Sequence, residues 1–585
     1  MNFMNAMDNY TPKTLGEKGH VQHSWSNELR EKIVQFSFQL VRTKDTKSLE
    51  TSLREMLNKI KHNERSYLKE LTMLYKLIGH TRDLKNGKGE YNLAFMQMVI
   101  WNEYYPELAH EAFKHFVVPY KEGVHQYGSW KDVKYMCNYI KENTAMEEED
   151  QEFIDFIIRL SIKQLNKDYE IMTKNKTQKN EQSTEPITLI GKWLPREKSK
   201  KFGWIHSRMA KMMYPHFITS RKRNSSKPSN KGLIKAKIFL NKKLTELNKY
   251  LNTVQVNMCG KKWRDINFNN VTSITMRKNK LAFNNKDKQG NKKSHESDRL
   301  ECADNFENHV KASFSDDTVK VHGKRCNVYE LVKDATEVNP KSLEADVVNQ
   351  QWKDNSKNNN GLGNIIPMSD TSSSMHIDDY LPFYNSIGLG IRVSEKTHPV
   401  LRNRILTFES NPKWVQLNDK QTFCEKVKHV KNISWGGSTD FFGAMKLILQ
   451  VLKTNKVPPS EVEDMVLAVF SDMQIDESMG HVAKSGFESS MNTMMDNIKA
   501  HYSACGYNPP HILFWNLRKT DGFPNLSTTE NTTMLSGYNA TMLNVFCEKG
   551  MEELRKITPA RMLEEQLNDE RYQVMGEYLI SFFEF

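Results

Sequence analysis

One acid and two alcohols stand at alternate positions directly after an apolar run. The run from Asn364 to Met368 leads into Asp370, Ser372 and Ser374, and Tyr380 to Leu389 then has helical spacing. In open α/β sheets, ligands bind at the carboxyl ends of the strands. Carboxylate and hydroxyl oxygens suit a hard cation such as Mg²⁺. The spacing therefore predicts a divalent-cation site in the loop after a buried strand.

Two later stretches supply further oxygen ligands in the same strand-to-helix setting. Thr439 follows two glycines and precedes the helical run from Phe441 to Leu452. The apolar run from Met465 to Phe470 ends in Ser471 and Asp472. The order Asp-x-Ser-x-Ser, then Thr, then strand-Asp resembles the metal-ion-dependent adhesion site (MIDAS) of von Willebrand factor A domains.

This resemblance implies a role for each oxygen ligand. In that family the hydroxyls touch the ion, the acids act largely through water, and a partner supplies an acidic oxygen to the open position. Many relatives have glycine where this chain has Thr371 and Ser373, so its loop is stiffer. The residues implied as metal ligands are Asp370, Ser372, Ser374, Thr439 and Asp472.

Other interpretations of the same residues stay open. A Ser, Thr or Asp after a strand commonly caps the next helix. A phosphatase of the haloacid dehalogenase type needs a second acid two residues after the first, and Ser372 occupies that place. The histidines are scattered, and no Ser-His-Asp or Cys-His arrangement stands out. The sequence predicts no catalytic residue, and a metal-dependent hydrolase is the least favoured alternative.

The composition favours anionic partners. The chain has 585 residues, a formal net charge of +13 and 38% hydrophobic residues, which points first to nucleic acid. A basic protein with solvated lysines is the plainer alternative. Seven cysteines form no Cys-x-x-Cys pair, which argues against a zinc ribbon or a disulfide scaffold. With no signal peptide or membrane-length apolar run in sight, we expect a cytoplasmic protein.

Helical periodicity dominates the first part of the chain, and strands alternate with helices after a polar boundary. The expected fold class is α plus α/β: an α-helical, solenoid-like repeat region, then a doubly wound von Willebrand factor A-like (Rossmann-like) domain. The expected strands are 363–368, 405–408, 465–470 and 511–515. The expected divisions are a flexible leader (1–26), the helical repeat region (27–352), a linker (353–361) and the A-like domain with a C-terminal helical segment (362–585).

Several short motifs are spread along the chain. They are Arg82-Asp83, Gly87 to Glu90, Gly128 to Asp132, Trp193 to Arg196, Phe470 to Met473 and Phe514 to Arg518. Over roughly residues 65–580 they resemble the family catalogued as domain of unknown function 2828. Helical repeats followed by an A domain are also similar to the Ro60-type TROVE proteins, and that similarity implies binding of structured RNA.

A basic stretch between Arg196 and Lys235 is the predicted nucleic-acid contact. It holds twelve Lys or Arg residues and one acid, Glu197, with aromatic residues among them. Cations neutralise phosphates and aromatic faces stack on bases. A helix pair that buries the aromatics explains the pattern equally well. Its basic triplet is also a possible nuclear-import cluster. The predicted residues are Lys200, Lys201, Arg208, Lys211, Arg221, Lys222 and Arg223.

These features predict a non-enzymatic scaffold associated with RNA or ribonucleoprotein. Its A-like domain would hold Mg²⁺ or another divalent cation. The alternative is a protein–protein interaction module that captures an acidic side chain through the metal without nucleic acid.

Overall fold

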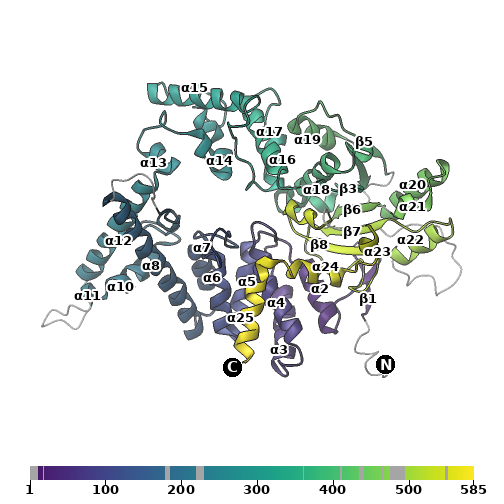
Figure 1. The fold of residues 1–585 in the computed structure, drawn as a ribbon, viewed down its shortest axis with the longest axis horizontal. Helices are drawn as coiled ribbons and strands as arrows, with labels where there is room; N and C mark the ends of the chain where they lie inside the picture. Colours follow the sequence, from purple (N-terminus) through teal and green to yellow (C-terminus); the bar gives the residue numbers. More distant parts are fainter. Residues whose placement is uncertain are drawn as a thin grey trace. The chain divides into compact units, whose positions relative to one another are not determined.

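The chain folds into two compact units, shown as ribbons in Figure 1. The sheet unit comprises Met1–Leu77, Asn86–Lys88 and Asn267–Gly576, and the helical unit comprises Ile78–Lys85, Gly89–Ile266 and Glu577–Phe585. The boundaries fall within helices α4 (Leu68–Arg82) and α25 (Glu570–Glu584). This computed structural model describes residues 11–17, 19–177, 185–218, 230–359, 361–408, 412–433, 440–463, 465–474, 494–546 and 551–584.

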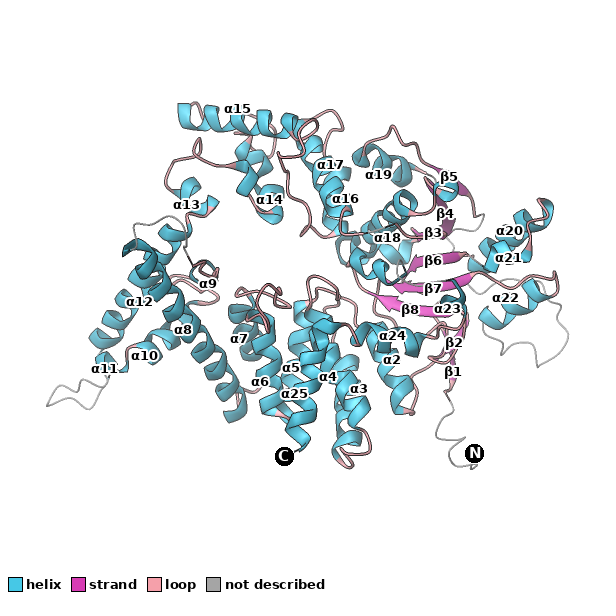
Figure 2. Cartoon of the chain, in the orientation of Figure 1, coloured by secondary structure: helices cyan, strands magenta, loops and turns pink. Residues whose placement is uncertain are grey.

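A six-stranded sheet lies at the centre of the sheet unit, in the order β5-β4-β3-β6-β7-β8 (Figure 2). All neighbouring strands are parallel except β4 and β5. The strand order reverses between β3 and β6, which makes their carboxyl ends a topological switch point where α/β proteins bind ligands. The strands are β3 (Ile365–Asp370), β4 (Arg404–Phe408), β5 (Trp414–Gln416), β6 (Val466–Ser471), β7 (His511–Asn516) and β8 (Thr532–Ser536).

Helices α18 (Ile377–Lys396) and α20 (Phe441–Thr454) cover opposite faces of this sheet. A Cβ atom added to Gly390 of α18 would lie 2.2 Å from Ser369 Oγ and 3.6 Å from Ile405 Cδ1, so α18 packs closely on that face. The next residue back along β4, Arg404, lines a cavity of about 370 Å³ together with residues of α20. Successive strand residues point to opposite faces, so the two helices sandwich β3 and β4.

The remaining helices of the sheet unit extend this core. Helix α16 packs on α18, where a Cβ atom at Gly388 would lie 2.2 Å from Val328 Cγ1. These helices are α2 (Leu29–Gln39), α3 (Lys47–Lys61), α14 (Ser273–Phe283), α15 (Ser297–Ala312), α16 (Val328–Glu337), α17 (Leu343–Ser356), α19 (Phe423–Asn432), α21 (Pro459–Glu463), α22 (Met494–Ser503), α23 (Met551–Arg555) and α24 (Pro559–Leu567).

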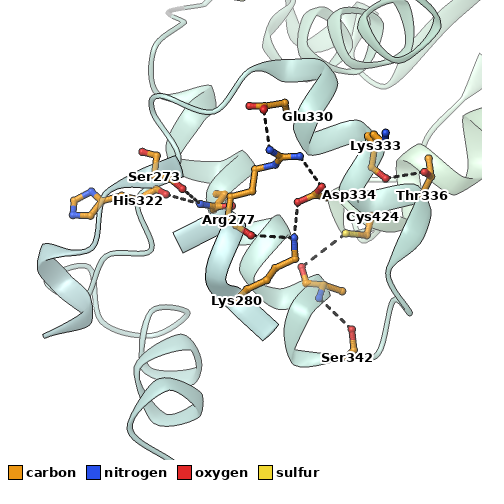
Figure 3. A network of polar contacts seen from close by, with 12 residues as sticks. Ser273, Arg277, Lys280, His322, Glu330, Lys333, Asp334, Thr336, Ser342 and Cys424 are labelled. Atoms are coloured by element: carbon orange, nitrogen blue, oxygen red, sulfur yellow. Dashed lines mark hydrogen bonds and ion pairs between the residues drawn. The ribbon is translucent and has the colours of Figure 1, made fainter. Parts of the chain in front are cut away.

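A charged network holds α14 against α16 within the sheet unit (Figure 3). The Arg277 guanidinium contacts Glu330 at 2.8 Å and Asp334 at 2.9 Å, and Lys280 Nζ contacts Asp334 at 2.5 Å. The two carboxylates raise the pKa of Arg277 against the opposing effect of burial. Residues 267–352, which we expected in the helical repeat region, therefore belong to the sheet unit.

The expected leader and linker also differ from the structure. Residues 13–15 and 21–23 form an antiparallel strand pair, β1 (Lys13–Leu15) and β2 (Val21–His23), which belongs to the sheet unit. The linker expected at 353–361 begins inside α17, which continues to Ser356. Asn355 is buried there, and its side-chain amide is satisfied because it donates to the carbonyls of Gly323 and Cys326 at 3.1 and 2.9 Å.

The described part of the helical unit contains helices and no strand. A buried ion pair fixes one of its turns: Arg82 donates through two nitrogens to Asp132, at 2.8 and 2.9 Å. A Cβ atom at Gly128 would lie 1.9 Å from Asp132 Oδ2, so only glycine leaves room for the pair. Its helices are α5 (Tyr91–Tyr104), α6 (Pro106–Val117), α7 (Asp132–Asn143), α8 (Glu148–Thr177), α9 (Ile190–Trp193), α10 (Gly203–Met213), α11 (Pro215–Ile218), α12 (Asn230–Leu251) and α13 (Val254–Cys259).

The structure confirms a mixed fold of helices with a mostly parallel sheet. It adds strands β5 and β8, which the sequence did not predict. A solenoid-like repeat and an A-type domain stay predictions. Within the described residues, no helix combines the length and apolarity that a bilayer crossing requires.

Candidate cation site and nucleic-acid interface

Two buried carboxylates lie at the switch point of the sheet. Asp370 ends β3 and Asp472 directly follows β6, the neighbouring parallel strand. Both residues are fully buried. Burial, reinforced by the nearby Asp472 carboxylate, raises the pKa of Asp370 to about 7, although hydrogen bonds from Ser471 and Ser372 oppose this shift. Two acids in one dry site favour a cation between or beside them.

Hydrogen bonds join Asp370 to the side chain of Ser471 and to the backbone of Ser372. Ser471 Oγ donates to Asp370 Oδ2 at 2.5 Å, and Ser372 N donates to Asp370 Oδ1 at 2.9 Å. The hydroxyls of Ser372 and Ser374 lie 2.9 Å apart. Ser372 precedes a 3₁₀ turn, η2 (Ser373–His376), without a side-chain capping bond. The loop thus presents its hydroxyls to one another and not to the helix backbone.

The second acid faces Arg518, which belongs to one of the family motifs but was not among the predicted site residues. Asp472 Oδ1 accepts from Gln474 N at 3.1 Å, and Asp472 Oδ2 forms an ion pair with Arg518 Nε at 2.9 Å. Arg518 Nη2 also donates to Glu17 Oε2 at 2.6 Å. Burial opposes the charge of Arg518, yet the Asp472 and Glu17 carboxylates raise its pKa.

The oxygen ligands at this edge fit a hard cation. Among the described residues, the buried Thr371 Oγ1 has no hydrogen-bond partner, and the ion pair with Arg518 is the only contact of Asp472 Oδ2. Carboxylates and hydroxyls are ligands that Mg²⁺ accepts, and it commonly keeps several waters. No group of three or more His, Cys, Asp or Glu residues suited to a metal occurs in the described ranges, so hydroxyls would have to complete the site.

The structure brings four of the five predicted metal ligands together. Asp370, Ser372, Ser374 and Asp472 meet at the carboxyl ends of β3 and β6. Thr439 lies outside the described residues. Its neighbour Asp440 caps α20, since its Oδ1 accepts from Gly443 N at 2.7 Å.

A cluster of lysines and aromatic rings lies in the helical unit. Lys134 Nζ is 5.2 Å from the ring centroid of Trp193, 5.6 Å from that of Tyr135 and 5.7 Å from that of Phe202. Lys131 and Lys192 lie 5.8 and 5.3 Å from the Trp193 ring. We call these six residues the Trp193 cluster; they come from α7 and the residue before it, from α9 and from the turn before α10.

Burial lowers the pKa of two lysines in the Trp193 cluster. Burial lowers the pKa of Lys134, and the charges of Lys131 and Arg196 lower it further. Burial alone lowers the pKa of Lys192. Neither Lys134 nor Lys192 makes an ion pair with any described residue. The aromatic ring faces offset part of the free-energy cost of burying these charged amines, and a bound anion would offset more of it.

The residues predicted for nucleic-acid contact divide into three groups. Lys200 and Lys211 are exposed. Lys201 contacts Glu142 at 3.3 Å, and Arg208 is held by Asp155 at 2.6 Å, so both already have acidic partners. The basic triplet Arg221, Lys222 and Arg223 lies outside the described residues.

Part of the aromatic pattern in that stretch is structural. Phe217 lies 5.2 Å from Phe239 of α12 and 5.9 Å from Tyr214, so these rings pack between helices. The predicted contact residues did not include Lys131, Lys134 and Lys192. The spacing of Lys131 and Lys134 could have indicated a shared basic face, because residues three apart at the start of a helix lie on the same side.

Comparisons with known proteins find two family models in succession. Residues 141–294 match "Domain of unknown function (DUF2828)", and residues 364–577 match "Domain of unknown function (DUF7788)". The predicted resemblance to the first family is thus confirmed, over a shorter range than the 65–580 expected. The chain is also 27% identical over 494 residues to "Uncharacterized protein L728" of Acanthamoeba polyphaga mimivirus, which covers 83% of this chain and 77% of that protein.

Among solved structures, the Ro protein (RSR) of Deinococcus radiodurans resembles this chain. The match covers 89% of this chain and 99% of that protein, with 9% sequence identity and a TM-score of 0.36. A relationship to Ro proteins was expected from the sequence, but a TM-score this low does not establish a common fold.

Proposed function

We propose that this chain, which carries matching segments of the DUF2828 and DUF7788 families, is an RNA-associated binding protein that contacts phosphates through its helical unit. The observation that carries this proposal is the Trp193 cluster, in which lysines crowd around aromatic rings. Lys134 and Lys192 have lowered pKa values and no acidic partner among the described residues. A polyanion that brings its charge to this surface offsets the burial of both amines and the repulsion of Lys134 by Lys131 and Arg196.

The aromatic rings of the cluster favour nucleic acid over a simple anion. Trp193, Tyr135 and Phe202 are each partly exposed, and base–aromatic stacking together with lysine–phosphate contacts is the usual mode of single-strand recognition. Stacking tolerates any base, so the cluster would bind unpaired RNA with little sequence preference. The net charge of +13 supports the same partner class.

The test is RNA retention by the full-length protein across a salt series. We expect Lys134→Ala/Lys192→Ala to weaken retention and to reduce the slope of log affinity against log salt by about 0.7 for each phosphate that is no longer neutralised. The matched control is Lys163→Ala/Lys167→Ala, which removes the same charge from exposed positions on α8. Unchanged affinity and slope in the first variant, or an equal weakening in the control, would overturn the proposal.

A second candidate function belongs to the sheet unit, which we propose is an A-type domain with an adhesion-type cation site and no enzymatic activity. The supporting observation is the buried Asp370–Asp472 pair joined to Ser372 and Ser374. A bound Mg²⁺ would offer an open coordination position to an acidic oxygen of a protein partner. The hydroxyls of Ser372, Ser374 and Thr439 would touch the ion, and Asp370 and Asp472 would act through water.

Calorimetric titration with Mn²⁺ tests the cation site. We expect Asp370→Asn and Asp472→Asn each to weaken binding strongly, because each removes a charge from a dry site. Glu461→Gln, at an exposed position of α21, should bind as the wild type does. Absence of a saturable Mn²⁺ site in the wild type and in Arg518→Gln would refute this second function.

A further inference from the structure

The N-terminal strand pair lies on the loop that follows β7. His23 N donates to Phe523 O and Phe523 N donates to His23 O, both at 3.0 Å. Gln22 Nε2 donates to Asp521 O at 3.3 Å, and the Trp25 and Phe523 rings meet edge to face at 5.0 Å. We call β1, β2 and the described residues between them the N-terminal hairpin. It is anchored on the segment that carries Arg518.

The turn of this hairpin reaches the acidic edge of the sheet. Glu17 N donates to Gln474 Oε1 at 2.8 Å, and Glu17 Oε2 accepts from Arg518 Nη2 at 2.6 Å. Arg518 in turn pairs with Asp472 Oδ2 at 2.9 Å. A continuous chain of contacts therefore connects an exposed carboxylate on the hairpin, 57% accessible, with a fully buried one at the switch point.

Arg518 places a positive charge beside Asp472, one of the two buried acids. Its side chain is 17% accessible, and it contacts one carboxylate on each side. Among the described residues, Arg518 is the only partner of Asp472 Oδ2. A divalent ion that bound this oxygen, directly or through water, would compete with the guanidinium for the same carboxylate.

We infer that Arg518 is an internal cation of the proposed metal site, held at Asp472 by Glu17 of the N-terminal hairpin, and that divalent ions compete with it. This inference rests on the proposed cation site of the sheet unit. Metal binding then releases Arg518 from Asp472 and weakens the hold on the hairpin. Arg518 is a positioning residue here. By neutralising Asp472, it lowers the affinity of the proposed site for a divalent ion.

Competition predicts tighter metal binding when the internal cation is removed. In calorimetric titration of the full-length protein with Mn²⁺, we expect Arg518→Gln to raise the affinity about tenfold, within the range usual for coupled sites. Glu17→Gln, at a mostly exposed position, should raise it less. The control Arg561→Gln removes an exposed arginine that pairs with Glu565 at 3.0 Å, and should leave the affinity unchanged.

Hydrogen exchange supplies a second readout that does not depend on affinity. In the wild type we expect Mn²⁺ to accelerate exchange of the His23 and Phe523 amides, which join the hairpin to its loop. In Asp472→Asn the ion should have no effect on these amides. Glu17→Gln keeps the experiment interpretable if Arg518→Gln proves unstable, because its side chain is largely in solvent.

The outcomes separate the inference from the function on which it rests. Mn²⁺ binding that is lost in Asp472→Asn, but is equal in the wild type, Arg518→Gln and Glu17→Gln, would overturn the inference and leave the metal site standing. No saturable binding in any of these proteins would overturn both.

Discussion

The two candidate sites treat like charges in opposite ways. At the edge of the sheet, Arg518 forms an ion pair at 2.9 Å with Asp472, one of the two buried carboxylates there. In the Trp193 cluster, the amines of Lys134 and Lys192 have aromatic rings as neighbours and no described acid. Where a charge already has an internal partner, a ligand must displace that partner before it binds. A charge without such a partner can bind an external ligand directly.

The largest expected effect is a loss of stability when the buried ion pair of the helical unit is broken. Arg82→Ala leaves the buried Asp132 carboxylate without its partner, and losing one half of a buried pair costs about 3–5 kcal/mol. Urea denaturation measures this loss. Arg159→Ala breaks a mostly exposed pair with Glu152 and should cost about 1 kcal/mol or less. Equal losses would mean that the Arg82–Asp132 pair does not organise the unit.

Acid sensitivity gives the next effect. Burial lowers the pKa of His511 in β7 to about 4. The unfolded chain gains a proton near the ordinary value of 6.5, so stability is complete above that pH and falls as the pH drops through about 4. Over the whole window the loss is at most about 3 kcal/mol.

His511→Asn should remove that part of the acid dependence. The measurement is the urea midpoint on either side of the window. His115 in the helical unit also has a pKa lowered by burial to about 4, so that unit serves as an internal reference. A variant whose acid dependence matches the wild type would contradict the assignment.

Stacking can be told apart from charge within the Trp193 cluster. Trp193→Ala should weaken RNA binding by about 1–3 kcal/mol, the usual value of one stacked base, while the salt dependence stays the same. Lys134→Ala should reduce the salt dependence as well. Trp193→Phe keeps a ring and should retain most of the affinity. If both aromatic variants bind equally weakly, stacking is not the contact.

The smallest effect concerns a lysine that already has a partner. Lys201 was predicted from the sequence to contact RNA, yet it pairs with Glu142 at 3.3 Å. Lys201→Ala should therefore change RNA retention by about twofold or less, because an exposed ion pair contributes little. A loss as large as that of Lys134→Ala would show that internal pairing does not decide which lysines bind.

The acids of the sheet were predictable because local signals mark them. Apolar runs end at Asp370 and before Asp472, and parallel strands bring their carboxyl ends to one edge. Arg518 was not predictable as a site residue, because its contacts with Asp472 and Glu17 join segments distant in the sequence. The sequence did not reveal the Trp193 cluster for the same reason, since Lys134 and Trp193 come from separate helices.

The polar stretch near residue 355 shows how composition misleads. Its asparagines and lysines predicted a linker, but Asn355 and Asn359 accept hydrogen bonds from the fully buried Arg392 at 2.9 and 2.7 Å. Arg392 also lies 4.1 Å from the Trp352 ring centroid. Burial lowers the pKa of Arg392 to about 10, and the amide oxygens accept from its two terminal nitrogens. These asparagines bind a buried arginine, and the sequence pattern alone does not distinguish buried asparagines from solvent-exposed ones.

Ultraviolet cross-linking of the full-length protein to unpaired RNA, followed by peptide mapping, tests the central claim most directly. The account predicts cross-links at Trp193, Tyr135 or Phe202, abolished at high salt and reduced in Lys134→Ala/Lys192→Ala. Cross-links confined to the sheet unit, or unaffected by that variant, would contradict it.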